Sequence, residues 1–185
     1  LPVYLLLDTS GSMTGEPIEA LRNGVQIMTS SLRQNPQAIE TAFLSVITFD
    51  SVATQIIPLT DLASFQMKEI RATGTTALGD ALQLVSRCID SEVKKTTAEI
   101  KGDYKPIVFV MTDGIPTDDF QAGVLEFKKR KVGIVVACAA GAGSDSSLLK
   151  QLTDNVVSID TMDTATIQKF FQWMSASIGS TSTKV

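Results

Sequence analysis

The sequence contains no histidine, and this absence disfavours several classes of function. Histidine is the commonest general base in enzymes and a frequent ligand of zinc. Acid–base catalysis through an imidazole and His-containing zinc sites are both ruled out.

Cysteine and long apolar runs are also scarce. The only two cysteines, Cys88 and Cys138, lie far apart in apolar surroundings, so we expect two buried free thiols in a reducing compartment and no disulfide. The longest apolar stretch, residues 132–140, is too short to cross a bilayer, and we expect no membrane insertion. No signal peptide is visible, and the sequence leaves open whether a targeting segment was removed.

Positive charge is sparse as well. Sixteen basic residues face 20 acidic ones, and the net charge is −4. No basic cluster exceeds residues 128–131, so nucleic acid is not an expected partner. With 185 residues, of which 44% are hydrophobic, the chain can form one domain with a sizeable core. We expect this domain to cover residues 1–179 and a flexible polar tail to cover 180–185.

Hydrophobic periodicity predicts alternating strands and helices. Strands are expected at 3–7, 41–49, 52–57, 107–111, 132–139 and 156–159. Helices are expected at 16–34, 78–93, 120–127, 148–152 and 167–178. Residues 59–72 predict a loop with room for one short helix, and Lys94 to Lys105 predicts a charged, irregular connection.

This alternation predicts an α/β fold with a doubly wound, mostly parallel six-stranded sheet and helices on both faces. The expected strand order is 3-2-1-4-5-6. Asp50-Ser51 reads as a hairpin turn, so the third strand is antiparallel, and Pro58 suits its place at an edge.

Oxygen-bearing side chains follow two of the buried strands. Asp8, Ser10 and Ser12 come directly after the apolar residues 3–7, and Asp113 follows residues 107–111. In the predicted strand order these two strands flank the point where the winding reverses, which is where such sheets bind ligands. Thr75 and Thr76 lie in a loop that we expect to cover the same crevice. Hard oxygen donors of this kind suit Mg²⁺ or Mn²⁺, with Ca²⁺ less favoured, and do not favour zinc.

These three motifs resemble the metal-ion-dependent adhesion site (MIDAS) of von Willebrand factor type A (VWA) domains. The resemblance rests on Asp8-Thr9-Ser10-Gly11-Ser12, on Gly74-Thr75-Thr76 with its following Ala-Leu, and on Thr112-Asp113-Gly114. It implies a metal held by Asp8, Ser10, Ser12, Thr76 and Asp113, with Thr75 as the alternative to Thr76. It also implies an interaction module, not an enzyme, in which an Asp or Glu of a partner protein completes the metal's coordination.

Within this family, longer runs resemble the compact TerY-like proteins of bacterial tellurium-resistance operons. The runs are residues 6–18, 74–82 and 110–118. This finer resemblance implies a cytoplasmic protein that works with a kinase and a phosphatase in stress signalling.

Other interpretations remain open at this stage. Each motif alone is also typical of a turn or a helix cap. A metal-dependent phosphohydrolase with Asp8 as nucleophile would share the strand-end Asp and the magnesium, but the place of a second Asp is taken by Ser10 and no histidine can carry the proton. A scaffold with a vestigial metal site is the third alternative.

Overall fold

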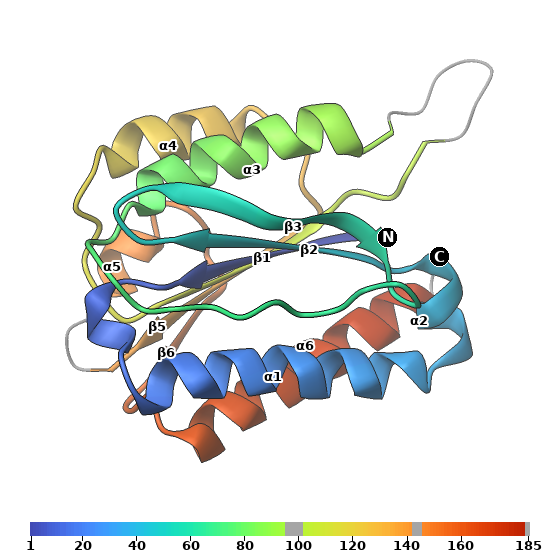
Figure 1. The fold of residues 1–185 in the computed structure, drawn as a ribbon. Coiled ribbons are helices and arrows are strands. Elements are labelled where there is room, and N and C mark those ends of the chain that lie inside the picture. The colour runs from blue at the N-terminus through green and yellow to red at the C-terminus, as the bar shows by residue number, and fades with distance from the viewer. Residues whose placement is uncertain (95–101, 142–145, 184–185) are drawn as a thin grey trace.

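The computed structural model describes residues 1–94, 102–141 and 146–183. Most of the predicted connection between Lys94 and Lys105 lies outside these residues. In the part that is described, a central sheet lies between two layers of helices (Figure 1). No helix among the described residues is both long and apolar enough to span a membrane.

The sheet has six strands in the order β3-β2-β1-β4-β5-β6, which confirms the predicted fold class. β2 and β3 pair antiparallel, and the other neighbouring strands pair parallel. The strands are β1 (Pro2–Asp8), β2 (Phe43–Phe49), β3 (Ala53–Asp61), β4 (Ile107–Thr112), β5 (Ile134–Ala140) and β6 (Val156–Ile159). β1 and β4 lie side by side at the centre of the sheet and run parallel. Asp8 and Asp113 therefore lie at the same end of the sheet, where the carboxyl ends of these strands meet.

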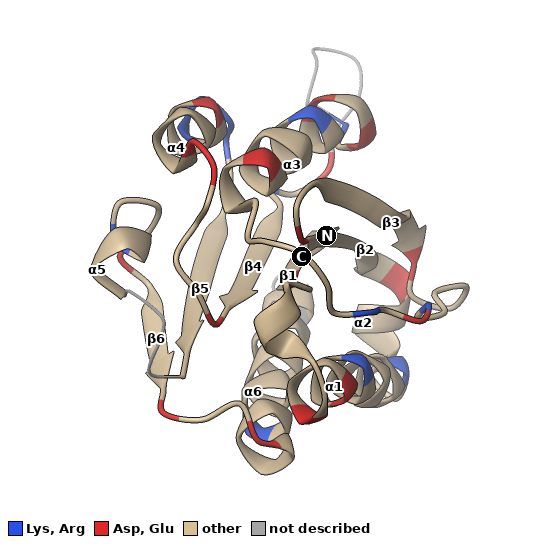
Figure 2. Ribbon diagram, turned by 60° about the vertical axis from the view of Figure 1, so that its left-hand side comes forward, with Lys and Arg blue, Asp and Glu red and all other residues tan. Residues whose placement is uncertain are grey.

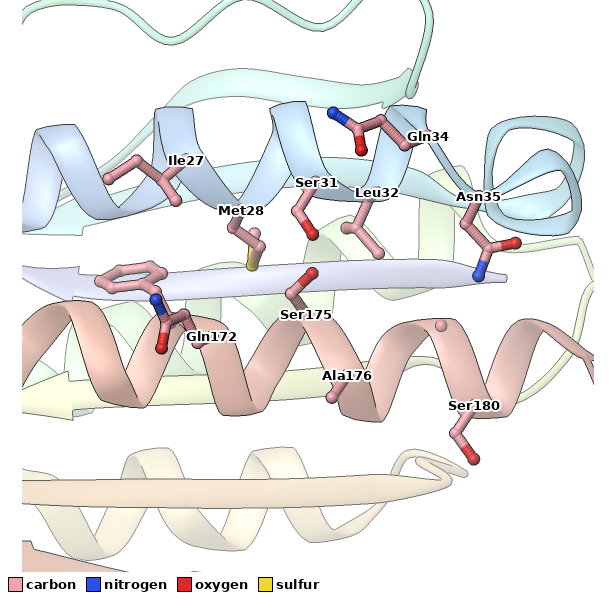
Figure 3. Close-up of a pocket in the computed structure, with 12 residues that line it drawn as sticks. Ile27, Met28, Ser31, Leu32, Gln34, Asn35, Gln172, Ser175, Ala176 and Ser180 are labelled. Atoms are coloured by element: carbon pink, nitrogen blue, oxygen red, sulfur yellow. The ribbon is translucent and has the colours of Figure 1, made fainter.

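The helices divide between the two faces of the sheet. One face carries α1 (Glu16–Arg33), α2 (Pro36–Thr41) and α6 (Thr164–Thr183), and the other carries α3 (Leu78–Glu92), α4 (Phe120–Lys128) and the short α5 (Ser146–Leu149) (Figure 1). A 3₁₀ turn, η1 (Gly11–Met13), leads into α1. α1 and α6 run side by side, and their far ends border a groove of about 620 Å³ into which Ser31 and Ser175 both point (Figure 3).

Alternate residues of β1 contribute to two separate hydrophobic cores, as expected of a strand buried on both faces. Val3, Leu5 and Leu7 pack with the helices α1 and α6. Tyr4 and Leu6 pack with α3 and α4. Both predicted thiols are buried and free, and burial raises the pKa of Cys88 to about 11 and that of Cys138 to about 12.

The structure corrects several predicted boundaries. The short helix α2 was missed: Asn35 was expected only to end α1, yet its side chain also accepts hydrogen bonds from the N–H groups of Gln37 and Ala38 and so caps a second helix. β3 continues through Pro58 to Asp61, because an edge strand tolerates a residue without an N–H. The segment from Phe65 to Ala77 contains no helix.

The last two helices also differ from the prediction. α5 ends at Leu149, and Leu152 is buried in the turn that follows it. α6 extends to Thr183, so residues 180–183 are helical where a tail was expected. Gly179 does not stop the helix; it lies against the Asn35 amide, where a Cβ would come within 3.2 Å of the nitrogen.

Candidate metal site

The hydroxyl of Ser12 joins the two motifs that the sequence places far apart. It donates a 2.9 Å hydrogen bond to Oδ1 of Asp113, and its oxygen lies 3.0 Å from the Oγ of Ser10. Ser10 is buried and Ser12 is exposed, so the three oxygens form a small cluster that opens to solvent. The structure thus brings Ser10, Ser12 and Asp113 together at the carboxyl ends of β1 and β4.

Asp8 lies directly behind this cluster and is fully buried. Its Oδ1 accepts a hydrogen bond from the Ser10 N–H, and its Oδ2 accepts one from the Thr112 hydroxyl at 2.8 Å and one from the Asp113 N–H at 3.4 Å. Both carboxylate oxygens are therefore held by protein donors. In this arrangement Asp8 orients the two loops and reaches a cation through water more readily than by direct contact.

The Thr75-Thr76 loop is the third part of the site. Thr76 is buried, and its hydroxyl lies 3.5 Å from the point where a Cβ on Gly114 would stand. Thr75 is exposed and its N–H and hydroxyl contact the Oγ of Ser51, on the β2–β3 hairpin. The structure therefore turns Thr76 towards the Asp113 loop and Thr75 away from it.

Thr117 and Asp118 fix the Thr76 loop in place. Thr117 accepts a hydrogen bond from the Thr76 N–H at 3.0 Å through its hydroxyl, and its own N–H donates to the Thr76 carbonyl at 2.8 Å. The Asp118 carboxylate accepts from the N–H groups of Gly79 and Asp80, at the start of α3. The run Pro-Thr-Asp after Gly114 is rich in turn and cap residues, but no spacing rule linked it to Thr76.

Two glycines allow these loops to approach so closely. Gly74 has φ of 74°, and a Cβ there would lie 2.4 Å from the Ser51 hydroxyl. A Cβ on Gly79 would lie 2.4 Å from the backbone oxygen of Asp119. The carbonyl of Gly74 also accepts a hydrogen bond from the Gly11 N–H, which ties the Thr76 loop to the first motif.

The electrostatics of the site favour a cation. Burial, and then the negative charge of Asp8, raise the pKa of Asp113 to about 6. None of the ion pairs among the described residues involves Asp8 or Asp113. A divalent cation would neutralise both carboxylates, and the hydroxyls of Ser10, Ser12 and Thr76 are oxygen donors of the kind that such ions accept.

The donor set contains only two carboxylates, so a divalent cation would find few charged ligands there. No group of three or more His, Cys, Asp or Glu side chains is placed to hold a metal ion within the described ranges. The cluster therefore depends on hydroxyl groups for most of its contacts. A cation held by so few charges keeps positions for water or for an acidic group from outside.

Comparisons with known proteins agree with this architecture. The family model of the von Willebrand factor type A domain matches residues 3–173. A comparison with curated protein sequences found no match. Many solved structures are similar to this chain.

A von Willebrand factor type A protein from Catenulispora acidiphila is 17% identical, with a TM-score of 0.72 over 96% of this chain and 42% of its own. The pilus adhesin SpaC from Lactobacillus rhamnosus GG is 14% identical, with a TM-score of 0.75 over 97% of this chain and 30% of its own. Proximal thread matrix protein 1 of the mussel byssus, described with a zinc-occupied MIDAS motif, is 19% identical, with a TM-score of 0.64 over 94% and 45%. The chain thus spans less than half the length of these three proteins.

Proposed function

The chain belongs to the von Willebrand factor type A family, and we propose that it is a divalent-metal-dependent protein-binding module. Its metal ligands are Ser10, Ser12, Thr76 and Asp113, with Asp8 bound through water. A partner protein supplies an Asp or Glu to the metal. The observation that carries this proposal is the position of the Ser12 hydroxyl between Ser10 and Asp113.

Mg²⁺ is the proposed resident metal, with Mn²⁺ as a substitute and Ca²⁺ less favoured, because all the donors are hard oxygens. The zinc described for the mussel protein makes Zn²⁺ a necessary comparison. Calorimetry with the four ions, on the intact protein and on Ser12→Ala, tests this order. Ser30→Ala, an exposed serine on α1, is the matched control.

An enzymatic role has less support from the geometry. A phosphohydrolase would need Asp8 as a free nucleophile. Asp8 has no exposed surface, and its oxygens already accept hydrogen bonds from Ser10 and Thr112. Metal-dependent phosphatase turnover that disappears in Asp8→Asn would reverse this conclusion.

The resemblance to TerY-like proteins supports a narrower proposal. On this proposal the module is a single domain that includes all of α6, and it works in a cytoplasmic tellurite-resistance or stress-signalling system with a kinase and a phosphatase as candidate partners. The support is the match of the runs 6–18, 74–82 and 110–118, together with two free buried thiols that suit a reducing compartment.

A pull-down from the native host tests the binding role. The intact protein should retain a partner in Mg²⁺ and release it in EDTA, and Asp113→Asn should fail to retain it. Retention that is undiminished in EDTA and in Asp113→Asn would instead identify a scaffold with a vestigial metal site.

A further inference from the structure

The segments that form and border the metal site are rich in acidic residues. Residues 8–20, 49–53, 73–81 and 112–122 contain no Lys or Arg, and the nearest cations along the chain are Arg22 and Arg71. The eight charged residues of these segments are all acidic: Asp8, Glu16, Glu19, Asp50, Asp80, Asp113, Asp118 and Asp119. The same separation is visible in Figure 2, where α4 is entered from an acidic loop and followed by a basic one.

Neutral backbone and hydroxyl groups donate hydrogen bonds to several of these acidic side chains. Glu16 accepts hydrogen bonds from Thr164, Asp50 accepts one from the Val52 N–H, and Asp119 accepts one from the Ala122 N–H. The ion pairs among the described residues involve only Asp90, Glu126, Lys129 and Arg130. The other six acidic residues of these segments form none of the ion pairs among the described residues, so a divalent ion that neutralises Asp8 and Asp113 leaves their negative charges without a paired cation.

An exposed apolar side chain lies beside the same site. Three large hydrophobic side chains are more than half exposed among the described residues: Val52 at 60%, Ile115 at 59% and Leu125 at 67%. Ile115 follows Asp113 and Gly114 directly. Its loop is fixed by the hydrogen bonds of Thr117 to Thr76 and of Asp118 to the start of α3, so the side chain is presented from an ordered position.

Val52 lies on the other side of the Thr76 loop. Its hairpin is tied to that loop because the Asp50 carbonyl accepts a hydrogen bond from the Ala77 N–H, and Ser51 contacts Thr75. Two of the three most exposed hydrophobic side chains thus flank the metal site. Leu125 lies within α4, outside the loops that form the site.

We propose that the partner docks with a basic segment that contains one acidic residue. The Asp or Glu binds the metal, neighbouring Lys or Arg side chains face the acidic rim, and an apolar side chain packs on Ile115. This inference rests on the proposed function. Acid-rich segments are disfavoured, because their remaining carboxylates would be repelled by the acidic residues of the segments that border the site.

Selection from a random peptide library tests the inference. The full chain is immobilised in Mg²⁺, and peptides are eluted with EDTA. The eluted peptides should contain a single Asp or Glu flanked by Lys or Arg, with an apolar residue nearby. Affinities of synthetic versions are then measured for the intact protein, for Ile115→Ser and for the matched control Leu125→Ser.

Ile115→Ser should weaken binding roughly tenfold, through the loss of one apolar contact, and Leu125→Ser should leave it unchanged. Affinity should also fall as NaCl rises from about 50 to about 500 mM. If the eluted peptides need their Asp or Glu but are rich in acidic residues, or bind Ile115→Ser as well as the intact protein, the inference is wrong and the proposed function stands. If no peptide needs both Mg²⁺ and its own carboxylate, the proposed function fails and this inference fails with it.

Discussion

The hydroxyl of Ser12 donates a hydrogen bond to Oδ1 of Asp113, a residue 101 positions later in the chain. This hydrogen bond joins the first and third motifs of the site. A cation bound there would be coordinated by the lone pair of the Ser12 hydroxyl and by the Asp113 carboxylate, with the hydroxyl proton turned away from Asp113.

Replacing both serines should remove metal binding and preserve the fold. In Ser10→Ala/Ser12→Ala, two of the direct oxygen donors disappear, and the affinity for Mg²⁺ or Mn²⁺ should fall roughly a hundredfold or more, measured by calorimetry. The free energy of unfolding should change by no more than about 1 kcal/mol, since Ser12 is exposed and the Ser10 hydroxyl contacts the Ser12 hydroxyl that is removed with it. Unchanged metal affinity would show that the cation binds elsewhere.

Replacement of Thr76 should lower the metal affinity, and replacement of Thr75 should not. Thr76→Ala removes a hydroxyl next to Gly114 and should weaken Mg²⁺ binding about tenfold or more, while its N–H can still donate to Thr117. Thr75→Ala removes only a contact with Ser51 and should leave the affinity within about twofold. Titration of both variants with Mn²⁺ decides the question, and equal losses would contradict the assignment of Thr76.

The raised pKa of Asp113 gives the metal-free protein a particular pH dependence. The folded-state pKa of about 6 exceeds the ordinary value of 3.8, so between these values the folded protein binds more protons than the unfolded chain. Stability should therefore rise as the pH falls from about 7 to about 5. Thermal unfolding in EDTA should show this rise in the intact protein and a flatter profile in Asp113→Asn.

Metal binding should follow the opposite direction. Below about pH 6 Asp113 is mostly protonated, and the proton competes with the cation for its carboxylate. Mg²⁺ affinity should therefore fall as the pH decreases. Metal affinity that stays constant between about pH 5 and 7 would exclude Asp113 as a ligand.

A polar cluster at the far end of α3 should matter for stability and not for metal binding. Glu92 accepts hydrogen bonds from the Tyr4 hydroxyl, the Gln55 amide and the Leu59 N–H on edge strand β3. Glu92→Ala leaves these donors without their acceptor and should cost about 2–3 kcal/mol in urea unfolding.

The metal affinity of Glu92→Ala should be unchanged, because the 15-residue helix α3 places Glu92 about 20 Å from the Thr76 loop. Glu92→Gln retains one acceptor oxygen and should lose less stability. A loss of metal affinity in folded Glu92→Ala would mean that the two ends of the helix are coupled.

The errors of the sequence analysis share a cause. The third strand was expected to stop at residue 57, with Pro58 beside a sheet edge; β3 instead continues through Pro58 to Asp61, because an edge strand tolerates a residue without an N–H. Residues 180–185 were expected to form a flexible polar tail, because they carry no apolar periodicity; packing of α6 against α1 and α2 extends the last helix to Thr183. In both cases a local preference was overridden by position in the fold.

The sequence by itself determined the sheet and the places where its two central strands end in oxygen donors. Buried apolar runs and helical periodicity can be read from neighbouring residues, and the right-handed crossover is a general rule. Together they put Asp8 and Asp113 at the carboxyl ends of two adjacent central strands. Only the tertiary structure decided which side chains meet there. The Thr112 hydroxyl on Asp8, Thr117 on Thr76 and the turn of Thr75 towards Ser51 are contacts between remote segments, and their geometry exists only once the helices have packed on the sheet.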